Sequence, residues 1–392
     1  MHSSKNHKEL VVITSRFPFP LEKGDKLRAY YQIKELSKHY NVHLISTTEH
    51  NVSSEDWKEL SIFCKSIHSF KIGKLEKWIG AGVNFFSAQP IQIGYFYHRR
   101  IHRKIKKVLE QIKPDHIYCQ LIRSAEYVKN YHDCPKTIDY MDALSKGVER
   151  RSEKAKGLVK LIFEKEFKRL LQYENAIFNY FEYHTIISEQ DRNYIFHKER
   201  EKIKIIPNGV DQSFLSYPTD LGKEKDLLFT GNMSYPPNIT ASNYIVKEII
   251  PKLEVPVMVT IAGANPTKEV EALNTDHVLI TGYVEDIKEY YGSHKIFVAP
   301  MFLGTGLQNK LLEAMAIGIP CITTTLANNA LRAKPDHEIL IADDSEQFAY
   351  QIQKLLKSEQ LRQDIASNAK IFIKENYNWN NVSTELIELI GV

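Results

Sequence analysis

The chain alternates short apolar runs, each the length of a buried strand, with segments whose apolar positions recur every three or four residues. The runs that predict strands lie at 10–14, 42–46, 67–71, 116–120, 137–141 and 185–188, and then at 227–230, 257–262, 278–281, 296–299, 321–324 and 339–342. Helical patterns fall between most of them, for example at 26–38, 238–250, 307–316 and 346–356, and one long helical region is expected over 151–183. This alternation predicts an α/β fold with parallel sheets covered on both faces.

Two such series in one chain predict two Rossmann-like domains, at 1–210 and 211–376. The seam should follow the Pro207–Asp211 motif, where Pro218 and Gly222 punctuate a polar stretch. Ligands of open α/β sheets bind beyond the carboxyl ends of the strands. Two domains that face each other would therefore place two ligands in one cleft.

Composition supports ordinary globular domains. The chain has 392 residues, of which 43% are hydrophobic and 26% charged, so extensive disorder is not expected. The net charge of +4 is uneven, because residues 1–200 carry 35 Lys/Arg against 24 Asp/Glu, whereas residues 201–392 carry 17 against 24. The basic first half and acidic second half are expected to meet different partners.

The densest basic run, 98–107, contains six Lys/Arg beside the apolar stripe of Ile101, Ile105 and Val108. A solvated helix with its stripe in the core explains this pattern. The alternative is a patch that faces an anionic membrane surface or an acidic acceptor. Nucleic acid is not expected as a partner, because aromatic residues do not interleave the cations.

The four cysteines show no metal-ligand spacing, which fits a reducing compartment. The first residues lack the apolar core of a signal peptide, and no run of 18 apolar residues exists. We expect a cytoplasmic protein, with peripheral association at the inner face of the cytoplasmic membrane as a further expectation.

The most informative segment is 302–324, where an apolar strand pattern leads through Gly304, Thr305 and Gly306 into a helical pattern. A glycine loop that feeds a helix N-terminus offers free N–H groups and a positive helix end to an anion. Lys310 adds a full charge one turn into the helix. Glu313 lies in an apolar stretch, where a ribose diol would supply two hydroxyl donors. The alternative is that both residues are ordinary solvated helix formers.

Several motifs occur together and in one order. Ile206–Asp211, Thr281–Asp286, the strand that ends at Pro300 and Leu311–Pro320 resemble the retaining GT-B glycosyltransferases of the family 4 type, also called glycosyl transferases group 1. The early segment Ser15–Arg28 resembles a subgroup of exopolysaccharide and cell-surface sugar transferases. The resemblance implies a GT-B fold with an acceptor domain at 1–210 and a donor domain at 211–376. It also implies that a C-terminal helix, 377–392, crosses back to the first domain.

The resemblance assigns roles to these positions. Glu313 would hold the donor ribose, and Lys310 would bind the diphosphate as a point charge together with the loop and helix start. The remaining donor-binding candidates are Gly231, Asn232, Met233, Gly282, Tyr283, Val284, Gly304, Thr305, Gly306, Leu307, Gln308 and Asn309. In the first domain, Gly24 and Asp25 would form a facing loop, with Arg16 and Arg28 as further cations. A simple turn with Asp25 as helix N-cap is equally compatible with the sequence.

Acidic residues after the strand at 137–141 are the acceptor-side candidates. The resemblance points to Asp139 and Asp142 for contact with the sugar or acceptor, although one of them could instead cap the next helix. Two departures from the family pattern are clear. Thr305 stands where many members have the first of two glutamates, and the 231–238 loop lacks the usual cations.

The expected reaction transfers a sugar from a nucleotide diphosphate sugar, UDP- or GDP-linked, to a hydroxyl of a glycan or lipid-linked acceptor, with retention. No permanently bound cofactor and no metal are expected, since helix N–H groups and Lys310 would stabilise the leaving group and no Asp-x-Asp motif is present. Two alternatives stay open. One is a catalytically weak or inactive binding or scaffold protein in a glycan assembly complex, and the other is a sugar-nucleotide epimerase. A Rossmann dehydrogenase does not fit the Ser15–Pro20 segment after the first strand.

Overall fold

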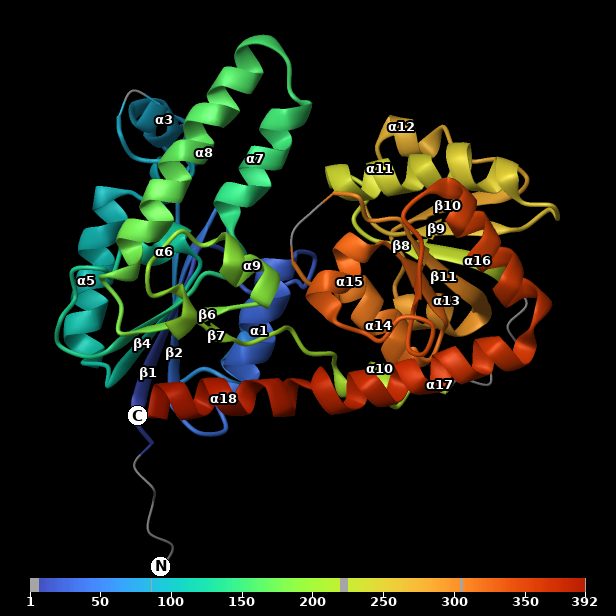
Figure 1. The fold of residues 1–392 in the computed structure, drawn as a ribbon. Coiled ribbons are helices and arrows are strands. Elements are labelled where there is room, and N and C mark those ends of the chain that lie inside the picture. Colours follow the sequence, from blue (N-terminus) through green and yellow to red (C-terminus); the bar gives the residue numbers. More distant parts are fainter. Residues whose placement is uncertain (1–6, 86, 219–224, 304–305, 392) are drawn as a thin grey trace, which may run out of the picture. The chain divides into compact units, whose positions relative to one another are not determined.

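The computed structural model describes residues 7–85, 87–218, 225–303 and 306–391, and it contains two compact units (Figure 1). The first unit is Met1–Pro207 with Ser383–Val392, and the second is Asn208–Val382. Each unit is built around its own parallel sheet. No helix of the described ranges is both long and apolar enough to cross a bilayer.

The first unit contains a seven-stranded parallel sheet in the order β3-β2-β1-β4-β5-β6-β7. Its strands are β1 (Glu9–Thr14), β2 (Asn41–Thr48), β3 (Ser66–Lys71), β4 (His116–Gln120), β5 (Lys136–Asp139), β6 (Tyr183–Ile186) and β7 (Lys204–Ile205). Its helices are α1 (Gly24–Leu36), α2 (Ser54–Ser61), α3 (Lys74–Phe85), α4 (Ile91–Phe96), α5 (Arg99–Ile112), α6 (Ile122–Ala125), α7 (Leu144–Lys154), α8 (Gly157–Phe178), α9 (Glu189–Tyr194) and the 3₁₀ turn η1 (Arg200–Lys202).

Alternation along β1 divides the core of the first unit between the two faces of the sheet. Val11 and Ile13 point to the face where α5 and α8 pack. Leu10 and Val12 point to the other face, which α1, α2 and the last helix, α18 (Trp379–Gly391), cover. Strands of a parallel sheet are buried on both faces, which explains their nearly continuous apolar sequences.

The second unit contains a six-stranded parallel sheet in the order β10-β9-β8-β11-β12-β13. Its strands are β8 (Lys225–Thr230), β9 (Val259–Ala262), β10 (Val278–Gly282), β11 (His294–Ala299), β12 (Cys321–Thr323) and β13 (Leu340–Ile341). Its helices are α10 (Gln212–Leu215), α11 (Pro236–Tyr244), α12 (Lys268–Glu271), α13 (Ile287–Ser293), α14 (Asn309–Ile317), α15 (Thr325–Leu331), α16 (Ser345–Lys357) and α17 (Glu359–Asn376), with the π-turn η2 (Ile245–Ile249) and 3₁₀ turn η3 (Ile250–Lys252) after α11.

The predicted fold class is confirmed. The long helical region expected over 151–183 is divided between two helices, α7 and α8, which meet at an extended Ala155 and Lys156. Gly157 begins α8 with a φ of 57°, a left-handed conformation that glycine adopts readily. The break turns one long helix into a helical hairpin (Figure 1).

The last helix, α18, links the two units in sequence and supplies core residues to the first. Leu386 and Ile390 are buried in the cluster that also contains Leu10 and Tyr40. The Tyr40 hydroxyl donates to the Ile387 carbonyl over 2.7 Å, and Lys8 Nζ donates to the Gly391 carbonyl over 3.0 Å. The C-terminal residues are therefore part of the first unit's packing.

Candidate functional site

The topology of the second unit places the expected donor residues at one point of the sheet. The chain runs outward from β8 through β9 to β10, and then returns to β11 on the other side of β8. In open α/β sheets, a reversal of this kind is the place where ligands bind, which here is between the loops that follow β8 and β11. The Gly231 loop follows β8, and the loop that leads into α14 follows β11.

The start of α14 is arranged for an anion. Gln308 is the N-cap residue, and within the described residues its side chain makes no hydrogen bond to the first turn of the helix. Gly306 has a φ of 82°, and its carbonyl accepts from Gln308 Nε2 over 3.3 Å. Leu307 is buried, and Asn309 Oδ1 accepts from Asn208 Nδ2 over 2.8 Å. Gly304 and Thr305 lie outside the described residues.

Lys310 projects from the first turn of α14 toward the β8 loop. Its Nζ donates to Asn238 Oδ1 over 2.5 Å and lies 4.4 Å from the centre of the Phe229 ring. Burial of the ammonium group lowers the Lys310 pKa to about 7. The attraction of Glu313 favours the charged form and only partly offsets this effect. An anionic ligand at this point would restore the charged form.

Glu313 lies one turn further along α14. Its Oε2 accepts from the Tyr291 hydroxyl over 3.1 Å, and that hydroxyl is also 2.7 Å from Thr230 Oγ1. Burial raises the Glu313 pKa to about 7, although the Tyr291 hydrogen bond and Lys310 both favour ionisation. The carboxylate thus has capacity for further hydrogen-bond donors, which the two hydroxyls of a ribose supply.

Gly231 allows the β8 loop to approach Lys310. Its φ is 152°, and a Cβ built there would lie 2.5 Å from Asn238 Nδ2 and 2.9 Å from Lys310 Nζ. Asn238 Nδ2 donates to the Asn232 carbonyl over 2.8 Å, so one amide joins the β8 loop to α14. The side chain of Met233 is buried and its N–H donates to the Ala264 carbonyl, which gives Met233 a packing role in this structure.

The loop after β10 holds the three residues expected at the base pocket. Gly282 has a φ of 69°, and its carbonyl accepts from Gly263 N over 3.0 Å. Tyr283 is 75% exposed and Val284 is half-buried. The Tyr283 ring is therefore accessible in the second unit.

In the first unit, Arg28 and Asp139 form a buried pair. Arg28 Nε and Nη2 donate to the two carboxylate oxygens of Asp139 over 2.7 and 3.0 Å, and neither side chain is exposed. Thr185 Oγ1 donates to Asp139 over 2.9 Å, and Arg28 also reaches the Pro207 carbonyl. Arg28 and Asp139, which were expected at the acceptor side, thus lie inside the first unit and connect α1 with β5 and β6.

A second group of charges surrounds Phe96 at the carboxyl ends of β1 and β4. Arg16 forms an ion pair with Asp25, which lies inside α1 and is not its N-cap; that position belongs to Lys23, next to Gly24. Arg16 and Arg123 lie 5.5 and 5.2 Å from the centre of the Phe96 ring.

Asp142 is half-buried, whereas Asp25 and Asp139 are buried. Burial raises its pKa to about 6, against the attraction of Arg123, with Asp25 and Asp139 adding to the rise. A carboxyl group with this pKa can hold or release a proton near neutral pH.

Sequence reasoning missed four residues that complete these groups: Asn238, Tyr291, Arg123 and Phe96. Asn238 carried a usable signal, because it is a polar side chain in the helix that follows a glycine loop. Tyr291 and Phe96 resemble any core aromatic residue in the sequence. Their positions depend on the three-dimensional packing.

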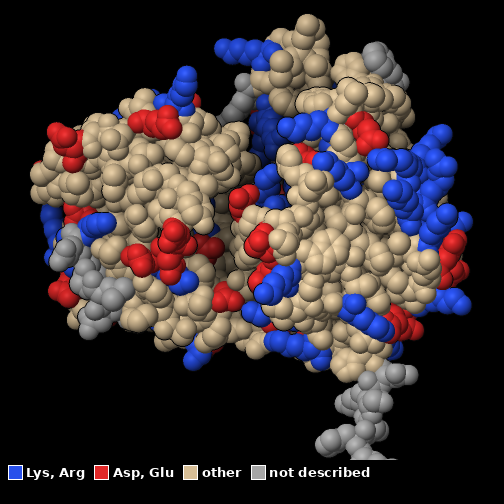
Figure 2. All heavy atoms as spheres, turned by 180° about the vertical axis from the view of Figure 1, so that it is seen from behind, with Lys and Arg blue, Asp and Glu red and all other residues tan. Residues whose placement is uncertain are grey.

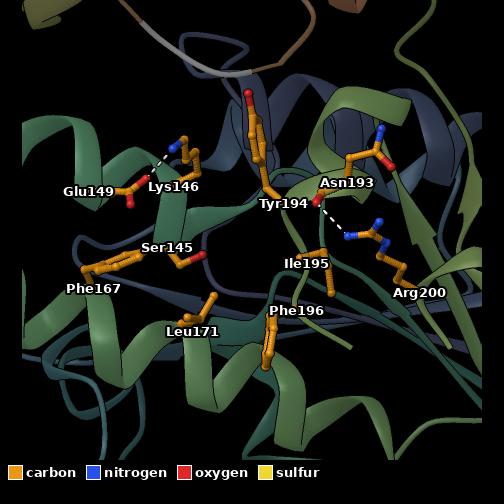
Figure 3. Close-up of a pocket in the computed structure, with 10 residues that line it drawn as sticks. All are labelled: Ser145, Lys146, Glu149, Phe167, Leu171, Asn193, Tyr194, Ile195, Phe196 and Arg200. Atoms are coloured by element: carbon orange, nitrogen blue, oxygen red, sulfur yellow. Dashed lines mark hydrogen bonds and ion pairs between the residues drawn. The ribbon is translucent and has the colours of Figure 1, made fainter. Parts of the chain in front are cut away.

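The first unit also contains a pocket of about 220 Å³ beside the base of the α7–α8 hairpin (Figure 3). Phe167, Leu171 and Phe196 form its apolar part, and Lys146, Tyr194 and Arg200 lie at its polar side. None of the residues predicted from the sequence lines it. Its location gives no direct support to the expected acceptor residues.

Comparison with known proteins identifies the second unit. Residues 224–358 match the model of the family described as glycosyl transferases group 1. Over these residues the second unit resembles the group 1 glycosyltransferases. A Klebsiella pneumoniae protein described as an uncharacterized 44.6 kDa protein in the cps region is 22% identical over 97% of this chain and 99% of its own length.

Two further relatives agree. An uncharacterized glycosyltransferase of Methanocaldococcus jannaschii is 24% identical over 50% of this chain and 56% of its own. The structure of HepE from Anabaena in complex with UDP and glucose superposes with a TM-score of 0.72, at 14% identity, over 98% of this chain and 100% of that one. The resemblance seen in the sequence is thus confirmed, as are the GT-B fold and the expectation of an enzyme that transfers a sugar.

Proposed function

We propose that this glycosyltransferase moves a sugar from a nucleoside diphosphate sugar to a hydroxyl of a glycan or lipid-linked acceptor, with retention, in cell-surface polysaccharide biosynthesis. The observation that carries the donor assignment is the half-buried pair of Lys310 and Glu313 on α14, each shifted away from its charged form. A diphosphate at Lys310 and a ribose at Glu313 would satisfy both groups. Hydroxyl–carboxylate and ammonium–phosphate contacts are among the stronger hydrogen bonds.

UDP is the nucleotide that we test first, and GDP the second. The HepE complex named above contains UDP, which supports a uridine donor without deciding it here. Lys310 and the first-turn N–H groups of α14 would stabilise the charge that develops on the departing diphosphate. We therefore propose that the transfer needs no divalent metal ion.

On the acceptor side, we assign contact with the sugar or acceptor hydroxyl to Asp142 rather than Asp139. Asp142 is half-buried with a pKa raised to about 6, whereas Asp139 is fully buried and held by Arg28. Arg28 and Asp139 then act as positioning residues that fix the strand end before Asp142. Cell-surface polysaccharide is proposed because the Klebsiella relative is named for a cps region and the Ser15–Arg28 segment resembles that subgroup.

The test is calorimetric titration of UDP into the wild-type protein, Glu313→Gln and a matched control, Glu375→Gln, which changes an exposed carboxylate on α17. Loss of one carboxylate–hydroxyl interaction of about 1.5–3 kcal/mol predicts that Glu313→Gln binds roughly 10- to 100-fold more weakly. The control should bind as the wild type does. Equal affinity in all three proteins would show that the ribose lies elsewhere.

A scaffold function is the second candidate, favoured by Thr305 and by the absence of cations in the sequence 231–238. It predicts UDP-sugar binding without turnover. Release of UDP that depends on both the acceptor and Asp142 would exclude it, and unaltered turnover in Asp142→Asn would contradict the acceptor-side assignment.

A further inference from the structure

Helix α3 has large apolar side chains on its exposed side and a lysine on its buried side, the reverse of an ordinary surface helix. The side that packs on the protein contains Lys77 and Ala81, which are 1% and 6% exposed. The outward side carries Leu75, Trp78, Ile79 and Val83, which are between 57% and 74% exposed. Lys77 is held inside by Glu49 over 2.9 Å and lies 4.8 Å from the Phe96 ring centre, so the orientation of α3 is fixed by specific contacts.

The contact between α3 and α4 also requires this orientation. A Cβ built on Gly80 would lie 2.2 Å from the Gly94 carbonyl oxygen, so the two helices meet at their glycines. Rotation of α3 to bury Trp78 would replace these glycines with larger side chains. The apolar face is therefore presented outward by the packing of the fold.

The first turns of α8 present a second apolar group. Leu158, Val159, Leu161 and Ile162 are all exposed, with Leu158 at 78%. Arg169 of α8 donates to the carbonyls of Asn84 and Phe85 over 3.1 Å each, and Lys165 lies 5.6 Å from the Phe85 ring centre. These contacts join the end of α3 to α8 two turns from the exposed group. Figure 1 shows α3 and the start of α8 at the same end of the first unit.

Positive charge accompanies these residues. Residues 146–169, which form α7 and the first half of α8, carry nine Lys/Arg against four Asp/Glu. Lys74, Lys156 and Lys160 are exposed beside the apolar side chains. Arg100, at the start of the basic helix α5, lies 3.2 Å from Glu76 of α3, so the exposed cations of α5 begin next to the apolar face. Figure 2 shows Lys and Arg gathered along the outer side of the first unit, and a largely uncharged surface at the end of that unit where Figure 1 shows α3 and the start of α8.

We infer that the outward faces of α3 and the start of α8 dock the enzyme on an anionic lipid bilayer. We call this surface, defined by Leu75, Trp78, Ile79, Val83, Leu158, Val159, Leu161 and Ile162, the docking face. Aliphatic side chains would enter the acyl boundary, and Trp78 would lie at the interface, where its ring is favoured. The lysines can extend their charged ends toward lipid phosphates.

A second copy of the chain is the competing occupant of the docking face. Symmetric association would bring Lys74, Lys156 and Lys160 toward the same residues of the partner, which charge repulsion opposes. Anionic headgroups instead complement these charges. The bilayer assignment goes beyond the proposed reaction and does not require it, because docking needs neither donor nor acceptor.

The test is flotation of the full chain with vesicles of phosphatidylcholine alone and of phosphatidylcholine mixed with phosphatidylglycerol. The protein should float with the mixed vesicles and lose binding as salt is raised. The variant Trp78→Ser/Leu158→Ser should bind roughly tenfold or more weakly, since each substitution removes a large apolar side chain from the interface. Tyr350→Ser/Ile371→Ser is the matched control, because it removes two exposed apolar side chains from the second unit.

Three results would overturn the inference. The first is no flotation of the wild-type protein with either vesicle, and the second is equal flotation of the wild type and the docking-face variant. The third is a dimer in light scattering that the docking-face variant abolishes while vesicles bind neither protein. Unchanged thermal unfolding of the variant would establish that weaker flotation is not misfolding.

Discussion

Lys310 gives the sharpest prediction, because its free and ligand-bound states should differ in charge. Burial lowers its pKa to about 7 in the empty site, and the attraction of Glu313 only partly opposes this effect. A bound diphosphate would favour the ammonium form and raise the pKa toward its ordinary value. Binding of UDP above pH 7 should therefore take up a proton at Lys310.

The affinity for UDP should therefore depend on pH. Between pH 7.5 and 9 the free protein holds Lys310 mainly neutral, so affinity should fall as pH rises, by up to about tenfold per pH unit. Glu313 would act in the opposite direction, because its pKa, raised to about 7, makes the carboxylate more ionised over the same range. The titration is therefore made in the Glu313→Gln background, which removes the carboxylate's own contribution and also the attraction that opposes the lowering of the Lys310 pKa.

The assay is calorimetry of UDP binding at several pH values in two buffers with different ionisation enthalpies, which gives the number of protons taken up. Glu313→Gln should take up close to one proton at pH 8. Adding Lys310→Met should weaken binding roughly 10- to 100-fold, abolish the proton uptake and flatten the pH dependence. Lys247→Met, which removes an exposed lysine of the second unit, is the control.

Two results would refute the reasoning in different ways. Affinity that stays flat from pH 7.5 to 9 would show that Lys310 is charged in the empty site. Unchanged affinity after Lys310→Met would show that the diphosphate does not bind there.

Three further predictions concern stability, the first two measured by denaturant unfolding and the third by thermal unfolding. Asp139→Ala should destabilise the protein by about 3–5 kcal/mol, because it removes the buried carboxylate that accepts from Arg28 Nε and Nη2, whereas Asp142→Ala should change stability by less than about 1 kcal/mol. Similar losses would contradict the different roles assigned to the two residues. Burial raises the pKa of Glu174 to about 7, so the folded protein resists ionisation of this carboxyl group. As pH rises from about 5 to 8, the wild-type protein should therefore lose up to about 3 kcal/mol of stability relative to Glu174→Gln. Parallel pH profiles of the two proteins would contradict this. Truncation before Trp379 should destabilise the first unit, because Leu386 and Ile390 leave its core, and an unchanged melting temperature would refute that role.

The sequence predicts the fold well where periodicity is strong. Every strand of the second sheet was expected within a few residues, because buried parallel strands are short apolar runs between helical patterns. The two-residue β7 was missed, since so short a strand has no period. The division of the helical region 151–183 into two helices was not predicted, because its helical composition continues through Ala155–Gly157 and the break appears only in the backbone conformation.

The candidate site was predictable only in part. Lys310 and Glu313 stand out because charges are rare in so apolar a helix. Their partners Asn238 and Tyr291 lie 72 and 22 residues away in sequence. Asn238 is marked only by its place in the helix after a glycine loop, and Tyr291 carries no signal of its contact with Glu313. Arg28 and Asp139 were expected near the acceptor, but the structure buries them against each other across 111 residues, a pairing that a single sequence does not reveal.

The most direct test of the proposed function is calorimetric titration of the full chain with UDP, GDP, ADP and dTDP, in EDTA and again with magnesium. We predict saturable binding of UDP or GDP with the same affinity in both conditions. Absence of binding to all four nucleotides by folded protein would contradict the donor site at Lys310 and Glu313. Binding that appears only with magnesium would contradict the metal-independent role given to Lys310 and the start of α14.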